Sequence, residues 1–202
     1  MGKSFVTPPG ITCFPSLFKP GAAVEGAEPK YAVTILLNKD DAKVQAWIPT
    51  LATAISEAIT ATWPDEASRP KNLLKCIKDG DTFTDRDGNL KKASYPEFAN
   101  CYALDARTKK RPKIVGPNGL ELLDESEIYS GIIGAAAFHL YSFDNVTKGV
   151  NAGLECFMKV ADGDPLGGGG SINPQDAFAD LIAANAGATQ SAAAKVGAEL
   201  FQ

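Results

Sequence analysis

The sequence has little of what enzyme active sites use most often. His139 is the only histidine and lies in an apolar run, so a triad or a cysteine and histidine pair has one candidate base. Neither a GxxxxGK[ST] nor a GxGxxG loop is present, and the four glycines at 167–170 are not followed by the lysine that a phosphate loop requires. These absences predict a protein that is not an enzyme.

Paired cysteines and long hydrophobic runs are missing as well. The four cysteines are far apart and form no CxxC pair, so a zinc site would lack its usual ligand spacing. We therefore expect reduced, mostly buried thiols, with no metal and no cofactor. The longest apolar stretch, around residues 132–140, is too short to cross a bilayer, and the N-terminus shows no export segment. We expect a soluble, cytoplasmic protein without a membrane partner.

Charge is unevenly distributed along this acidic chain. The sequence has 20 basic and 24 acidic residues, yet residues 86–113 include eight basic and three acidic ones. Residues 114–202 reverse this balance, with three basic and eleven acidic residues. A flexible phosphate chain would be attracted to the middle of the sequence and repelled by its end. A solvated loop face is the alternative interpretation, because charge runs commonly are just that.

Periodicity predicts a mainly β protein with one inserted helix. Residues 31–37 alternate as a strand does, and residues 11–18 suit an edge or bulged strand because a proline interrupts them. Apolar residues recur at helical spacing over 40–60, so we expect one helix there, kinked or restarted at Pro49. Trp47 lies on the apolar stripe of this helix, which favours a place in the core.

Further strands are expected after the helix. Residues 98–107 and 112–115 have strand character, and residues 128–143 and 150–160 flank a turn at 144–149, which predicts a long hairpin. Glycines inside the first strand of this hairpin indicate a bulge or a sharply curved sheet. Several curved antiparallel strands with one inserted helix favour a five-stranded antiparallel barrel of the OB-fold type.

The composition changes again after these strands. We predict a nucleic-acid-binding barrel domain over residues 1–165, followed by a glycine-rich linker and a flexible, mildly acidic C-terminal tail over 166–202. Large apolar residues are few in the tail, so burial there would not offset the entropy lost on ordering.

Binding of unpaired nucleic acid needs cations along a groove and flat side chains on which bases can stack. The middle of the chain supplies both. The candidate cations are Lys91, Lys92, Arg107, Lys109, Lys110, Arg111 and Lys113, with Lys71, Lys75, Lys78 and Lys148 as a second group. The candidate stacking residues are Tyr95, Phe98, Tyr102, Tyr129, Tyr141 and Phe143. Each ring has the alternative of filling the core, since large aromatic side chains are usually interior or half-buried.

An acidic run between residues 79 and 87 is the remaining candidate for chemistry. As a calcium loop starting at Asp85, it would have Leu90 where glycine is needed and Pro96 where the bidentate glutamate belongs. A hairpin turn is therefore the favoured interpretation. Clustered carboxylates also serve two-metal nucleases, so a metal-dependent nuclease is kept as the one enzymatic alternative.

Six segments carry a resemblance to a known family. They are Phe14-Pro15-Ser16-Leu17-Phe18-Lys19-Pro20, Tyr31-Ala32-Val33-Thr34-Ile35-Leu36-Leu37-Asn38-Lys39-Asp40-Asp41, Asp79-Gly80-Asp81, Glu127-Ile128-Tyr129-Ser130-Gly131, Lys148-Gly149-Val150-Asn151-Ala152-Gly153-Leu154 and Asp162-Gly163-Asp164-Pro165-Leu166-Gly167-Gly168. In this order they resemble a family of tailed-bacteriophage single-stranded DNA-binding proteins, over residues 11–170. The resemblance implies an OB-fold that coats single-stranded DNA without sequence preference in phage replication or recombination, with duplex DNA as a further ligand.

The resemblance also bears on the tail. In other phage and bacterial single-strand binders, an acidic tail that ends in an aromatic residue recruits replication partners and competes with DNA for the groove. Here the tail has few acids and ends in Gln202 after Phe201, so an inert solubilising extension is the alternative.

We therefore expect a non-catalytic single-stranded DNA-binding protein. Its expected partners are single-stranded DNA, and replication or recombination proteins that the tail would contact, while self-association stays open. A virion structural β-protein, in which the basic patch would be a subunit contact, is the alternative from another class.

Overall fold

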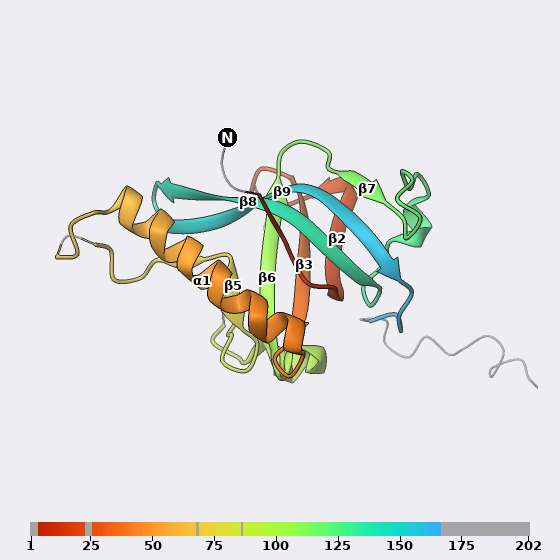
Figure 1. Ribbon diagram of the computed structural model, residues 1–202, viewed down its shortest axis with the longest axis horizontal. Helices are drawn as coiled ribbons and strands as arrows, with labels where there is room; N and C mark the ends of the chain where they lie inside the picture. The colour runs from red at the N-terminus through yellow and green to blue at the C-terminus, as the bar shows by residue number, and fades with distance from the viewer. Residues whose placement is uncertain (1–3, 23–25, 68, 86, 167–202) are drawn as a thin grey trace, which may run out of the picture. The chain divides into compact units, whose positions relative to one another are not determined.

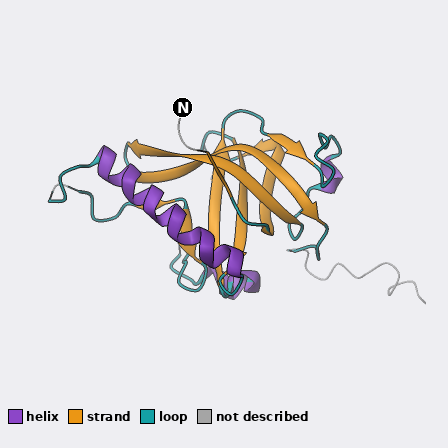
Figure 2. Ribbon diagram, viewed as in Figure 1, coloured by secondary structure: helices purple, strands orange, loops and turns teal. Residues whose placement is uncertain are grey.

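The long strands of the sheet close into a barrel (Figures 1 and 2). Four of the five contacts between neighbouring strands are antiparallel, and the contact between β6 and β9 is parallel and closes the ring. In chain order the neighbours run 1-2-3-5-4-1, a Greek-key barrel of the OB type. The five strands are β2 (Gly10–Gly21), β3 (Lys30–Asn38), β6 (Cys101–Thr108), β8 (Ile133–Asp144) and β9 (Lys148–Ala161).

The structure is a computed structural model and describes residues 4–22, 26–67, 69–85 and 87–166. The predicted tail, residues 166–202, lies outside the described residues except for Leu166. Within the described part, short strands extend the sheet at its edges. They are β1 (Ser4–Val6) on β8, β4 (Leu74–Lys75) and β7 (Lys113–Val115) on β9, and β5 (Ile77–Asp79) on β6.

The fold prediction is confirmed: the protein is mainly β with one long inserted helix and an OB-like barrel. Its sheet is mixed, because the predicted antiparallel order does not extend to the β6–β9 contact. That contact joins strands separated in the chain by β7, η2 and β8, and local periodicity carries no signal for such a pairing. None of the helices in the described part of the chain is long and apolar enough to cross a membrane.

The inserted helix α1 (Ala42–Thr62) covers one side of the barrel and contacts β8 and β9 (Figure 2). It begins after Asp41, whose carboxylate accepts a hydrogen bond from the Lys43 N–H, and it continues through Pro49 without ending. Trp47 packs edge-on against Phe138, with ring centroids 6.4 Å apart. Trp47 is half-buried and packs against the core, in line with its predicted place on the apolar stripe of the helix.

The second half of strand β3 is buried on both of its faces. Val33, Ile35 and Leu37 point into the barrel core, while Leu36 on the opposite face is 1% exposed. A second, smaller cluster covers that outer face. Its buried members are Cys13, Leu36, Phe98, Cys101 and Ala103, and the short helices α2 (Lys91–Ser94) and η1 (Pro96–Phe98) lie over it.

Two of the predicted strands begin later than expected. The segment predicted as a strand from 98 begins at Cys101, because Pro96 opens the 3-10 turn η1. The segment predicted from 128 follows another 3-10 turn, η2 (Glu125–Glu127), and becomes β8 only at Ile133. The bulge expected from a strand glycine is confirmed, since the register shifts between Ile133 and Gly134.

Candidate nucleic-acid interface

A groove of about 500 Å³ crosses the outer face of β2, β3 and β6. Successive side chains of a strand point to opposite faces, so Val33 and Ala106 fill the core while their neighbours line the groove. Thr34 of β3 lies opposite Asp105 of β6 in the ladder, and Ala32 lies opposite Arg107. Further residues complete the groove, namely Phe14, Ser16 and Gly21 of β2, then Ala22, Ala27, Glu28, Lys78, Phe83, Lys91 and Phe98.

The charged side chains of the groove are mostly cationic. Asp105 is engaged, because it accepts a hydrogen bond from Thr34 Oγ1 at 2.6 Å and pairs with Lys78 at 3.5 Å. Glu28 pairs with Lys109 at 2.8 Å, and this hydrogen bond lowers the pKa of the Glu28 carboxyl. The other three cations form no ion pair with any described residue. They are Lys30, Lys91 and Arg107.

Aromatic rings gather at one end of the groove. Phe14 and Tyr95 meet edge to face with centroids 5.1 Å apart, and the Lys91 ammonium lies 5.0 Å and 4.4 Å from their respective centroids. Phe83 is half-buried, with Lys78 at 4.0 Å from its centroid. Buried Phe98 supports all three rings from beneath. Cations beside partly exposed rings are what a single strand with alternating phosphates and bases requires.

Phe14 adopts a backbone conformation that is rare for a bulky residue. Its φ is 50°, in the left-handed region that costs an L-residue about 1–2 kcal/mol. Its N–H donates a hydrogen bond to Ser130 Oγ at 3.1 Å, and the residue is 42% exposed. Strained residues of this kind cluster at functional sites. The fold thus holds an apolar ring at the surface where the groove begins.

A clamp of charged groups attaches the segment with Lys91 to the barrel. We define the clamp as Lys39, Asp79, Asp81, Lys92 and Asn100. Lys39 Nζ lies 2.6 Å from Asp79 and 2.8 Å from Asp81, and Lys92 Nζ lies 3.1 Å from Asp81. The Asn100 N–H also donates to Asp81. Hydrogen bonds from Lys39, then Lys92, hold the pKa of the Asp81 carboxyl well below its ordinary value of 3.8.

Replacing Asp81 by asparagine is expected to lower the melting temperature at pH 7. It should also reduce the fall of the melting temperature as the pH is lowered. A carboxyl whose pKa is lowered by folding stabilises the native state above its ordinary value of 3.8, and this contribution is lost as the pH falls toward the folded pKa. Thermal unfolding from pH 7 to below pH 4 measures both effects. Asp87→Asn is the control, because Asp87 forms no ion pair with the described residues; equal slopes for both variants would contradict the prediction.

The groove gathers several of the residues predicted from sequence. Arg107 and Lys91 line it, as do Lys78 of the second group and buried Phe98, while Tyr95 belongs to the aromatic cluster. Phe98 was expected to lie at the start of a strand, as a candidate stacking residue. That expectation is wrong, because Phe98 lies in η1 with 1% exposure and supports exposed rings instead.

Other predicted residues lie away from the groove lining. Lys92 belongs to the clamp, and Tyr102 packs against the barrel core with Lys39 at 5.2 Å from its ring centroid. The Tyr129 hydroxyl donates toward Asp162 and Gly163. The remaining ones have surface positions on β8, β4, β7 and the loops: Tyr141, Phe143, Lys71, Lys75, Lys109, Lys110, Arg111 and Lys113.

Among the aromatic rings and cations of the groove, three were not predicted from sequence: Phe14, Phe83 and Lys30. Phe14 precedes the proline that interrupts the first predicted strand. This interruption could have indicated an irregular strand at which a side chain points away from the core. Phe83 stands alone between two threonines in a polar segment, and an isolated aromatic in such a setting is a second usable signal. Lys30 starts β3 without any local signal.

The acidic run between residues 79 and 87 forms turns. Asp79 and Asp81 are held by the clamp, and Asp85 accepts hydrogen bonds from the N–H groups of Asp87 and Asn89. Within residues 4–22, 26–67, 69–85 and 87–166, no group of three His, Cys, Asp or Glu side chains could hold a metal ion.

An OB-type barrel with a cationic groove and exposed rings defines a protein of the single-strand nucleic-acid-binding class. The chain belongs to the Enterobacter phage Enc34 ssDNA-binding protein family, whose model matches residues 11–189. The family resemblance noted in the sequence is confirmed. No curated protein matches the chain.

Solved structures agree with this assignment. The single-stranded DNA-binding protein from bacteriophage Enc34 in complex with ssDNA superimposes with a TM-score of 0.67 at 25% identity, covering 81% of this chain and 89% of that one. A C-terminal truncation of the same phage protein gives 0.63 at 26% identity, with 81% and 88% covered. The single-stranded DNA-binding protein gp2.5 of bacteriophage T7 gives 0.57 at 18% identity, with 89% and 94% covered, and this likeness concerns the fold.

Proposed function

We propose that this protein binds single-stranded DNA in the groove, without sequence preference, and acts in phage DNA replication or recombination in the host cytoplasm. One observation carries the proposal: Lys30, Lys91 and Arg107 line one groove without ion pairs to described residues, beside the exposed Phe14 ring. The cations would replace counterions on phosphates, and bases would stack on Phe14 and Phe83.

The groove favours single strands because stacking on a ring requires a base that is free of its neighbours. It also suits any sequence, since every base has a π-face and every nucleotide has a phosphate. Beyond the Arg107 end, the strand would continue over the loop cations Lys109, Lys110, Arg111 and Lys113, where duplex DNA would find phosphate contacts only. The tail is the proposed contact for replication or recombination proteins, and no catalytic role is proposed.

Fluorescence anisotropy of labelled oligo-dT, with a matched duplex in parallel, tests the function across a salt series. We expect preferential oligo-dT binding that weakens steeply with salt, because counterion release drives it. Equal affinity for the duplex would contradict the stacking groove. Absence of binding to either ligand would favour the structural-protein alternative.

Phe14→Ala isolates the stacking contribution in the same assay. Loss of one stacked base costs about 1–3 kcal/mol, so oligo-dT affinity should fall roughly 5-fold to 150-fold while the salt slope stays unchanged. Phe143→Ala is the control, because Phe143 is a half-buried ring of β8 outside the groove lining. A loss of equal size in both variants would remove Phe14 from the site.

A further inference from the structure

One end of the barrel domain is acidic and has exposed leucines. Residues 116–127 follow β7 and consist of a hairpin turn, in which the Gly116 N–H donates to the Leu120 carbonyl, and the 3-10 turn η2. Leu122 turns inward against the core, whereas Leu120 and Leu123 are 68% and 74% exposed. This segment has four acidic residues and no basic one; Glu125 pairs with Lys19 and Glu127 with Lys159, whereas Glu121 forms no ion pair with described residues. We call it the acidic end.

A basic surface with exposed apolar residues lies on β4 and the β8–β9 turn. Leu74 is 49% exposed and Val146 is fully exposed. Lys71 and Lys75 are exposed as well and form no ion pair with described residues. Strand β4 pairs with Gly149 and Val150, which brings Leu74 and Lys75 close to the turn with Val146. We call this surface the basic end.

The close pairing at the basic end depends on Gly149. A Cβ atom at this position would lie 2.1 Å from the Leu74 carbonyl oxygen, so only glycine allows the two backbones to approach so closely. The apolar tip and the lysines are therefore held together by a backbone constraint.

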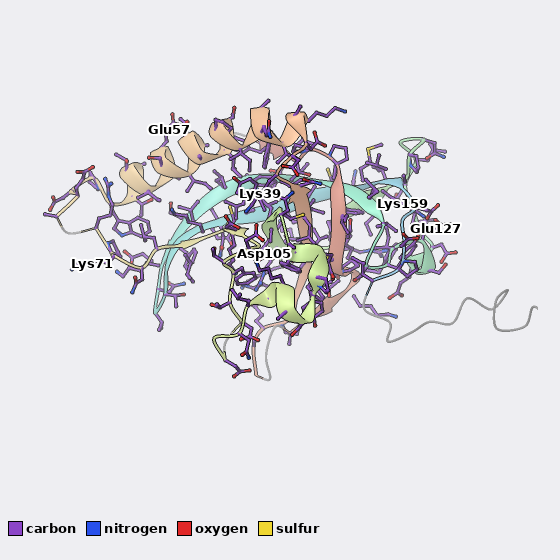
Figure 3. All side chains as sticks on the ribbon, turned by 90° about the horizontal axis from the view of Figure 1, so that it is seen from below. Lys39, Glu57, Lys71, Asp105, Glu127 and Lys159 are labelled. Carbon is purple, nitrogen blue, oxygen red and sulfur yellow. The ribbon has the colours of Figure 1, made fainter. Side chains whose placement is uncertain are left out.

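The two surfaces lie at opposite ends of the barrel domain. Figure 3 labels Lys71 at one end and Glu127 at the other, and Asp105, which lines the groove, lies between them. In Figure 1 the acidic end adjoins β7, and α1 leads toward the loop with Lys71. A contact between such unlike surfaces of two copies is heterologous, and it leads to an open row instead of a closed dimer.

We propose that the acidic end of one copy docks against the basic end of the next copy on the same DNA strand. This inference rests on the proposed function. Leu120 and Leu123 would meet Leu74 and Val146, and carboxylates such as Glu121 would face Lys71 and Lys75. Exposed ion pairs contribute little each, so the contact is weak between free molecules and forms when DNA brings neighbours together.

Two charge-reversed proteins test the contact. The basic-end variant has Lys71→Glu with Lys75→Glu, and the acidic-end variant has Glu121→Lys with Glu125→Lys. With either variant alone, the two ends that meet between neighbouring copies would carry like charges. In an equimolar mixture that alternates along the strand, each contact would again join opposite charges. The same holds for one protein with all four changes. The affinity per site is measured on a short oligo-dT that accommodates one protein and on a longer oligo-dT that accommodates several. The ratio of the two affinities gives the cooperativity.

We expect about tenfold weaker cooperativity for each variant alone, and recovery in the mixture and in the fourfold variant. One-site affinity should stay at the unaltered level. A fall in one-site affinity of the basic-end variant would overturn the proposal, because Lys71 and Lys75 would then contact DNA. If one-site binding is intact but the mixture does not recover cooperativity, only the contact between copies is overturned. If the unaltered protein does not bind the one-site oligo-dT at all, the proposed function is overturned as well.

Discussion

Simultaneous replacement of Lys30, Lys91 and Arg107 by methionine is expected to lower oligo-dT affinity on the order of 100-fold at about 0.1 M salt. Each phosphate contact on a single strand contributes about 0.7 to the slope of log affinity against log salt, so the slope should fall by about 2. Methionine keeps most of the aliphatic volume, so the loss reports charge. Oligo-dT titrations at several salt concentrations measure both quantities.

The matched comparison is a triple replacement of Lys109, Lys110 and Arg111, also by methionine. These cations lie outside the groove lining, and Lys109 is already paired with Glu28. We expect weaker binding and a shallower salt slope here too, but a smaller loss than for the groove cations. If the loop variant loses as much as the groove variant or more, the main path of the strand lies over the loop.

Gly131→Ala is expected to lower the free energy of unfolding by about 3 kcal/mol or more, the upper range for backbone strain. Gly131 has a φ of 117°, and a Cβ atom there would lie 1.9 Å from the carbonyl oxygen of Asp164. The strand entry and the chain after β9 are joined at this point, since the Leu166 N–H donates to the Ser130 carbonyl at 2.7 Å. Alanine would force them apart.

Urea unfolding of Gly131→Ala and of Gly119→Ala separates the cost of the positive φ from the cost of the clash with Asp164. Gly119 also has a positive φ, 75°, but a Cβ atom there meets nothing within 4 Å. This control should lose only the left-handed penalty of about 1–2 kcal/mol. Equal losses would show that the clash with Asp164 is relieved at no cost. Because Ser130 adjoins Gly131 and holds Phe14, we also expect Gly131→Ala to weaken DNA binding.

Local patterns were sufficient for the elements whose packing is regular. The helical spacing of Val44, Leu51 and Ile55 predicted α1, because a stripe of this period can only be buried by a helix. Alternation likewise predicted β3, and the charge run predicted Arg107 in the groove. For these residues, the regular period of the helix or strand determines to which face each side chain points.

The rest of the site depends on backbone features that leave weak traces in sequence. Phe14 faces the groove because its φ is positive, and Phe98 leaves the strand because Pro96 opens a turn. Phe83 reaches the groove from a loop about seventy residues away in sequence from Phe14, and no local pattern joins the two. The parallel contact of β6 with β9 is of the same kind, since it is settled by barrel closure.

The double burial of β3 has a consequence for how a strand can enter the groove. The floor of the groove lies on β3, whose residues cannot move without disrupting both hydrophobic clusters. The side formed by α2 is different, because this helix has four residues and no buried one. One side can therefore yield while the floor keeps its shape. For the proposed DNA binding, a strand would then enter the groove sideways at any internal position, so neither a free end nor threading would be needed, and closed circles would be as accessible as linear ends.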